Sequence, residues 1–231
     1  MSGISQWLQQ LNFDGMVGML ITALAAMICV TVHEVSHGYA AYRLGDMTAK
    51  NAGRLTLNPI KHLDITGLIS MALVGFGWAK AVPVNFGCLR NYRRDTIIIS
   101  LAGPVSNILL AVIFLTAYYA LVGMQIVFHW PMWTGYLVQF CWYGVHLNTG
   151  LAMFNLLPIP PLDGSKVVLA FLPERWYWWM LSRERFGFIA LALLLFFGVL
   201  DRPLIFLRNG LLGLLDPICR WPLALLNSLV G

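Results

Sequence analysis

Long apolar runs separated by short basic clusters constrain this chain more than any other feature of its sequence. Only 11% of the 231 residues are charged, whereas a soluble domain carries about 25%. The chain therefore lacks the polar surface needed to cover a water-facing core of its size. An apolar helix of about 20 residues crosses a bilayer. We expect an all-α polytopic membrane protein with about four transmembrane helices, at residues 15–43, 96–123, 134–157 and 186–200.

The basic clusters predict how these spans are threaded, because Lys and Arg concentrate in cytoplasmic loops. The short, Gly-rich run at 65–79 could either cross the membrane or dip into it and return. If it returns, twelve of the fifteen Lys and Arg residues lie on one side. We therefore favour a re-entrant segment in a multi-pass protein of the cell membrane, with the basic loops in the cytoplasm. Positive charge scattered in this way argues against a nucleic-acid-binding face.

Three shorter segments complete the expected architecture. Residues 53–57 alternate weakly and predict a short strand, and Val82-Pro83-Val84 offers either an extended edge for a substrate strand or one arm of a plain hairpin. The tail at 203–231 is apolar but interrupted by charges, which favours an interfacial amphipathic segment. No repeat divides the chain, so we expect one membrane-embedded metalloprotease domain over 1–231: a catalytic core at about 15–175, followed by a C-terminal helix and tail at 176–231.

The sequence His33-Glu34-Val35-Ser36-His37 is an H-E-x-x-H motif within the first apolar run. Side chains at i and i+4 lie one helical turn apart, so both imidazoles can bind one metal ion. Glu34 is then placed to act as general base on the metal's water. The motif precedes Arg43 by about 15 Å of helix, near mid-depth of a bilayer, where ionisable groups are costly and usually functional. A polar helix end is the weaker interpretation.

A catalytic zinc ion commonly has three protein ligands and a water, so the motif calls for a third ligand. Asp163 is the better candidate because it follows a proline-rich helix break, and broken helices build ion sites in membrane proteins. It could equally be only an N-cap, and His146 in the 134–157 run is a competing ligand. For His146 and Asn148 we slightly favour hydrogen bonds to neighbouring helices over a polar path to the metal.

These segments together resemble the site-2 protease family of intramembrane metalloproteases. HEVSH in an apolar helix is followed far downstream by NLLPIPPLDG at 155–164, and Gly103-Pro104-Val105-Ser106-Asn107 also matches. The segment FGWAKAVPVN at 76–85 is similar to the GWAKPVPVN segment of short bacterial members, with Ala81 in place of a proline. The likeness covers about residues 28–166, and no PDZ-like insertion is present.

The resemblance implies one Zn²⁺ per chain, held by His33, His37 and Asp163, with Glu34 as general base. It also implies that Asn155 lies near the metal, where it orients the substrate or stabilises the oxyanion. Asn107 is expected to line the site. The expected reaction is hydrolysis of peptide bonds in or near transmembrane segments. The expected partners of the protein are a transmembrane protein substrate and the lipid bilayer. No nucleic acid is expected among them.

Two other classes of function use the same residue types. A non-proteolytic membrane scaffold could keep a metal site for stability or regulation, and a metal or proton transporter could also contain buried His, Glu and Asp. Glu34 separates these alternatives from a protease. Hydrolysis requires a carboxylate beside the first histidine, whereas a scaffold or a transporter does not.

Overall fold

The computed structural model describes residues 13–67, 79–131, 133–173, 175 and 184–228. Within these ranges every regular element is a helix and no strand occurs, which confirms the all-α class. The helices are α2 (Phe13–Arg43), α3 (Thr48–Asn51), η1 (Pro59–His62), η2 (Phe86–Cys88), α5 (Tyr92–Phe128), α6 (Thr134–Asn155), α7 (Asp163–Phe171), α9 (Glu184–Phe196), α10 (Asp201–Cys219) and α11 (Trp221–Asn227).

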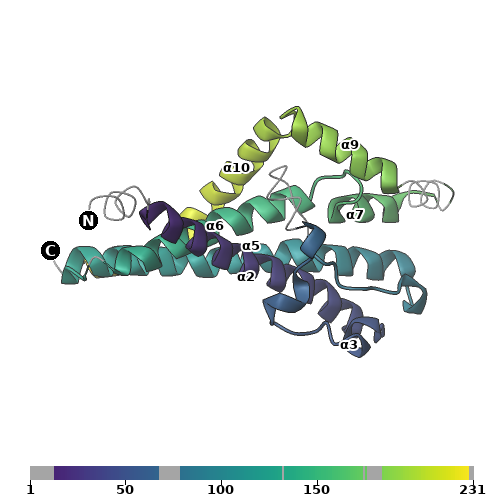
Figure 1. Ribbon diagram of the computed structural model, residues 1–231, viewed down its shortest axis with the longest axis horizontal. Helices are drawn as coiled ribbons and strands as arrows, with labels where there is room; N and C mark the ends of the chain where they lie inside the picture. The colour runs from purple at the N-terminus through teal and green to yellow at the C-terminus, as the bar shows by residue number, and fades with distance from the viewer. Residues whose placement is uncertain (1–12, 68–78, 132, 174, 176–183, 229–231) are drawn as a thin grey trace, which may run out of the picture.

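The 37-residue helix α5 is the central element of the fold, and α2, α6, α7 and α11 all pack against it (Figure 1). Gly144 of α6 makes one close approach possible, because a Cβ there would lie 2.7 Å from the Phe114 ring of α5. The buried core where these helices meet consists mainly of small and medium-sized side chains. Its members are Cys29, Ala111, Phe114, Leu115, Cys141, Val145, Leu215 and Cys219.

Two helices of the described chain, α2 over Gly15–Arg43 and α5, are long and apolar enough to cross a membrane. The pair α9 and α10 bends by 86° and adds a third crossing if it is one broken span. It forms an arch on the α6 side of the bundle (Figure 1). Helix α6 has 22 residues but is not among these candidate spans. Four crossing helices therefore stay a prediction.

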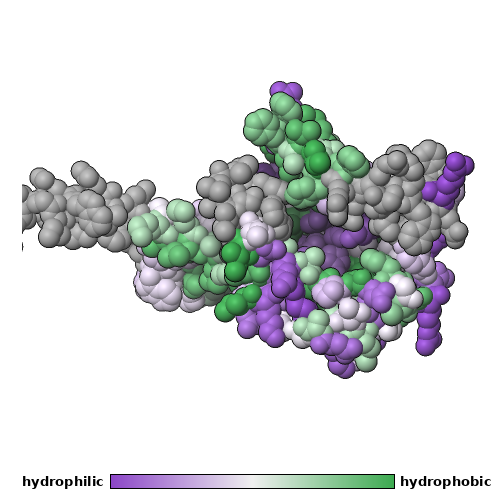
Figure 2. Space-filling model, turned by 45° about the vertical axis from the view of Figure 1, so that its right-hand side comes forward, coloured by the Kyte–Doolittle hydropathy of each residue, from purple (hydrophilic) through white to green (hydrophobic). Residues whose placement is uncertain are grey.

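The surface of this arch is largely apolar, as Figure 2 shows at the top of the molecule. Phe196, Phe197 and Phe206 are each more than 70% exposed. Polar side chains gather in the hollow beneath the arch. Exposed aromatic side chains in such numbers are unfavourable in water but suit a lipid environment.

The predicted strand at 53–57 is wrong, because no described segment pairs with it as a strand and the amides of Gly53 and Arg54 bond backbone carbonyls of the preceding helical turn. The His62 ring bonds the Thr56 carbonyl through Nε2, at 2.8 Å. The Arg54 guanidinium donates to the backbone carbonyls of Lys80 and Ala81. Residues 82–84 are likewise extended without belonging to a strand. Most of the predicted re-entrant segment, 68–78, lies outside the described residues.

The tail packs onto the bundle through α10 and α11. Leu215 and Cys219 are buried in the core shared with α5 and α6. Asp216 accepts hydrogen bonds from Tyr119 of α5 and from Arg220. These contacts tie the tail to the bundle, and its interfacial position stays a prediction.

Candidate metal centre

Helix α2 presents the two histidines of the H-E-x-x-H motif on one buried face. His33 is 5% and His37 9% exposed, and their rings meet edge to face with centroids 4.6 Å apart. The two Nε2 atoms are 3.1 Å apart. The i, i+4 spacing thus directs both nitrogens to one point, as the sequence predicts.

Asp163 reaches the same point from the first turn of α7. Its Oδ2 lies 3.3 Å from Nε2 of His33 and 3.1 Å from Nε2 of His37, and the three potential ligand atoms lie within 4.8 Å of one another. The N-cap of α7 is Leu162, so Asp163 is not the N-cap that local sequence also allowed. His146 lies outside this group and packs against the Trp142 ring, with its Nδ1 unbonded.

The helix break between α6 and α7 brings Asp163 back over the bundle. Helix α6 ends at Asn155, and the proline-rich turn that follows leads directly into α7. Gly164 is required at this fold-back, because a Cβ there would lie 2.7 Å from the Leu157 carbonyl oxygen. The turn therefore determines the position of the carboxylate, although no single residue of it touches the histidines.

The Asp163 carboxylate is buried, with 8% of the residue exposed, and Lys166 Nζ lies 3.9 Å from its Oδ1. Burial raises the pKa of Asp163, and the nearby Lys166 ammonium lowers it. The ionised form of this carboxyl group is the one that binds a metal ion.

A buried amide chain orients His33. Asn107 of α5 and Asn148 of α6 are both fully buried, and His33 Nδ1 lies 2.5 Å from Asn107 Oδ1. Asn107 donates through Nδ2 to Asn148 Oδ1 at 2.7 Å and to the Cys29 carbonyl. Asn148 thus bonds neighbouring helices and, through Asn107, also continues a polar path to His33, so both expected roles apply to it. The link from Asn107 to the imidazole was missed, because sequence spacing cannot register two helices against each other.

His37 is oriented by the backbone of α5, because its Nδ1 lies 2.7 Å from the Ile99 carbonyl oxygen. A carbonyl oxygen can only accept a hydrogen bond. The same holds for Asn107 Oδ1, which faces His33 because the Asn107 amide nitrogen donates to the Cys29 carbonyl and to Asn148. We therefore assign the proton of each ring to Nδ1. Both Nε2 lone pairs then face each other and a carboxylate oxygen, an arrangement that a cation stabilises.

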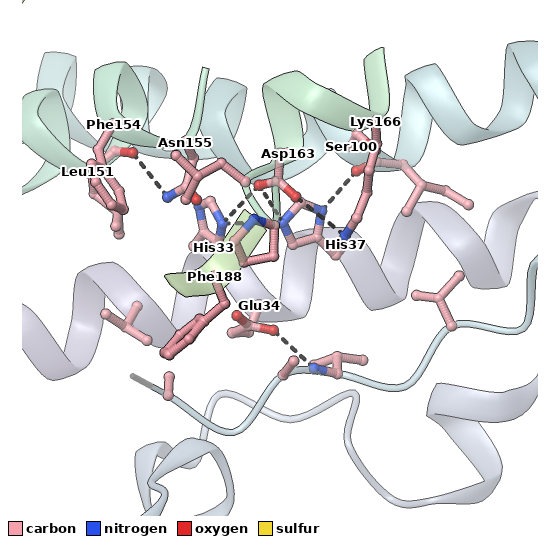
Figure 3. Close-up of a pocket in the computed structure, with 18 of the residues that line it drawn as sticks. His33, Glu34, His37, Ser100, Leu151, Phe154, Asn155, Asp163, Lys166 and Phe188 are labelled. Atoms are coloured by element: carbon pink, nitrogen blue, oxygen red, sulfur yellow. Dashed lines mark hydrogen bonds and ion pairs between the residues drawn. The ribbon is translucent and has the colours of Figure 1, made fainter. Parts of the chain in front are cut away.

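Glu34 lies beside the two histidines in a cavity of about 490 Å³, whose walls include Phe154, Phe188 and Leu191 (Figure 3). Its Oε2 accepts a hydrogen bond of 2.8 Å from the Val82 amide. No hydrogen bond from another described residue reaches the second carboxylate oxygen. Glu34 can therefore take up a proton in this cavity while one of its oxygens is held.

Asn155, at the C-terminal end of α6, also lines the cavity. Its Nδ2 donates to the Leu151 carbonyl at 3.0 Å, which orients the amide (Figure 3). A primary amide carries two N–H bonds, so one remains for a group in the cavity. The structure thus brings all five sequence-predicted site residues to one cavity, together with Asn107 behind His33.

The sequence model of Peptidase family M50 matches residues 21–197. The protein named "Putative zinc metalloprotease YwhC" of Bacillus subtilis is 43% identical over 173 residues, 74% of this chain and 78% of that protein. "Putative zinc metalloprotease Rip2" of Mycolicibacterium smegmatis is 31% identical over 198 residues, 80% of this chain and 71% of that protein. No solved structure matches the chain significantly.

Proposed function

Because the chain belongs to Peptidase family M50, the site-2 protease family, and is a metalloprotease, we propose that it cleaves transmembrane proteins within the depth of the bilayer. The observation that carries the proposal is the convergence of His33 and His37 from α2 with Asp163 from α7. Glu34 lines the same cavity, so a carboxylate base stands beside three potential ligands. A transmembrane protein substrate and the surrounding lipid are the partners we propose.

The three side chains fit a zinc ion by geometry. Ligand atoms about 2.0–2.1 Å from a tetrahedral zinc lie roughly 3.3–3.4 Å from one another. The separations between the two Nε2 atoms and Asp163 Oδ2 are 3.1, 3.1 and 3.3 Å. Two nitrogens and one oxygen leave a fourth position for water, which is the ligand set of a catalytic zinc site. We propose one ion per chain.

Zinc bound there would lower the pKa of its water toward about 7 and polarise the scissile carbonyl. In the proposed reaction, Glu34 accepts the proton of the attacking water through the carboxylate oxygen that the Val82 amide leaves free. It then delivers this proton to the leaving amine nitrogen. The remaining N–H of Asn155 donates to the developing oxyanion, a contribution of about 3–4 kcal/mol at comparable sites.

The depth of the motif supports action inside the membrane. His33 and His37 belong to α2, one of the two described helices that could each span a bilayer, and they precede Arg43 by two to three helical turns. Ionisable side chains at such depth line wet cavities or pair with one another. The apolar walls of the cavity suit the apolar side chains of a transmembrane segment, which must unwind locally to expose its carbonyls.

A Glu34→Gln variant tests the proposal against a metal-binding scaffold or transporter. We expect cleavage of a transmembrane reporter substrate to be abolished, because the amide cannot accept the proton, while bound zinc remains at the wild-type level. The measurement pairs reporter cleavage with zinc content of the purified protein. Cleavage at the wild-type rate would refute the mechanism, and loss of zinc would make Glu34 a ligand instead of a base.

A further inference from the structure

One wall of the cavity is the segment at residues 79–86, which runs from the start of the described range 79–131 to the first residue of η2. Its residues Ala79, Ala81, Val82, Val84 and Phe86 line the cavity. Val82 is 7% exposed, and a Cβ at Gly38 of α2 would lie 2.7 Å from its side chain. The segment therefore rests directly on the helix that carries the metal-binding motif.

The N-terminal end of this segment is held by Arg54. The Arg54 Nη2 donates to the Lys80 carbonyl at 2.6 Å and to the Ala81 carbonyl at 3.4 Å. Arg54 is only 8% exposed and forms no ion pair with an acidic residue of the described chain. A buried charge without a counter-ion is costly. The carbonyl dipoles of Lys80 and Ala81, which accept hydrogen bonds from the guanidinium, offset part of this cost.

The C-terminal end is held by Asp46, which is fully buried just after α2. Asp46 Oδ2 accepts from the Asn85 amide at 2.7 Å. Its Oδ1 accepts from the amide of Thr48 at 2.9 Å and from the hydroxyl of the same residue. Two buried side chains of opposite charge thus fix the two ends of one short segment, each through its backbone.

Between these two anchors, the Val82 amide donates to Glu34 Oε2 (Figure 3). We propose that Arg54 and Asp46 are positioning residues that clamp the segment 79–86, so that the Val82 amide holds the Glu34 carboxylate in its working orientation. This inference rests on the function proposed above. Neither residue lines the cavity, so both act through the segment. A glutamate has three side-chain torsions, and a base displaced by about 1 Å can lose 10²-fold in rate.

The test compares Arg54→Gln with the matched control Arg94→Gln, which removes the same charge from an exposed position at the start of α5. We expect Arg54→Gln to lower kcat on the reporter substrate 10- to 100-fold with KM changed less than twofold. Hydrogen exchange at the Val82 and Asn85 amides should accelerate, while zinc content stays at the wild-type level. Arg54→Lys, which keeps one donor, should restore part of kcat. Arg94→Gln should leave all four quantities unchanged.

Asp46→Ala gives an independent measurement if Arg54→Gln fails to fold, and its kcat should fall in the same way. In the double variant the two losses should not multiply, because both act through one segment. Unchanged kcat with faster exchange would overturn the proposal, as would an effect on KM alone. A raised kcat would also overturn it and identify the segment as a gate. Failure of the proposed function would appear separately, as cleavage by Glu34→Gln, and exchange at Val82 reads the clamp without any cleavage.

Discussion

Replacing Gly103 by alanine should remove the metal while leaving the helix intact. Gly103 faces the two histidines from α5, and a Cβ there would lie 2.6 Å from Cε1 of His33 and of His37. His37 Nε2 lies closer still, and ordinary contact begins at 3.4 Å, so the imidazoles or α5 must move by at least about 0.8 Å. Both rings are fixed, by Asn107 and by the Ile99 carbonyl. Ligand distances tolerate only about ±0.2 Å.

We therefore expect Gly103→Ala to weaken zinc binding at least about 100-fold, or by about 2.8 kcal/mol. Helix propensity acts in the opposite direction, because alanine favours a helix over glycine by about 1 kcal/mol. Overpacking against the two rings costs about 1–3 kcal/mol and offsets this gain, so in excess chelator the variant should unfold at the wild-type temperature or moderately below it. Added zinc should raise the unfolding temperature of the wild type but not that of the variant.

The assay is zinc competition against a chelator of known affinity, combined with thermal unfolding with and without zinc. Gly150→Ala on α6 is the matched control, because no atom lies within 4 Å of its added Cβ and zinc affinity should not change. Wild-type zinc affinity in Gly103→Ala would refute the reasoning. It would mean that the imidazoles are not held where the hydrogen bonds of Asn107 and Ile99 place them.

Two further predictions concern the hydrogen bonds of His33 and of Asp46. Asn107→Ala removes the acceptor at His33 Nδ1 and should weaken zinc binding 10- to 100-fold, as loss of a partner of a metal-bound histidine commonly does. The control Ser106→Ala, on the same helix, should leave zinc affinity unchanged in the same chelator competition. Burial raises the pKa of Asp46, but hydrogen bonds from Thr48 and the Asn85 amide outweigh burial and lower it. The stability that the Asp46 carboxylate gives to the segment is therefore complete above the unfolded pKa of about 3.9. It is lost as the pH falls further, toward the lower pKa of the folded state. The difference in Asn85 exchange protection between wild type and Asp46→Asn should then be constant from about pH 7 to 5 and shrink below about pH 4, and a difference that grows on acidification would contradict this.

The proposed ligand pair and the proposed base could be predicted from sequence because their juxtaposition depends on helical periodicity alone. His33 and His37 are one turn apart in any α-helix, and the apolar run around them leaves few alternatives to a helix. Asp163 was harder, since local sequence equally allowed an N-cap. Resemblance to a family, rather than spacing, selected it among the candidates, and the fold-back at Gly164 shows how the chain brings it there.

The errors and omissions share one cause. The strand expected at 53–57 reflects a local pattern, but its backbone bonds the preceding helical turn and the His62 side chain instead of a described strand. Arg54 looked like one more cytoplasmic charge, because the positive-inside rule treats basic residues alike. The structure instead buries it against the carbonyls of residues 80 and 81.

The amino-acid sequence alone determined the helical class, the membrane character and the H-E-x-x-H pair, because these follow from hydropathy and from the 3.6-residue period of one helix. Tertiary structure alone decided which groups meet that pair. Asn107, Asn148 and the Val82 amide belong to other segments. Their register is set by close packing at positions such as Gly38 and Gly103, where segments meet α2, and Gly144, where α6 meets α5. Contacts between distant segments depend on the whole packed bundle, so no short window of sequence contains them.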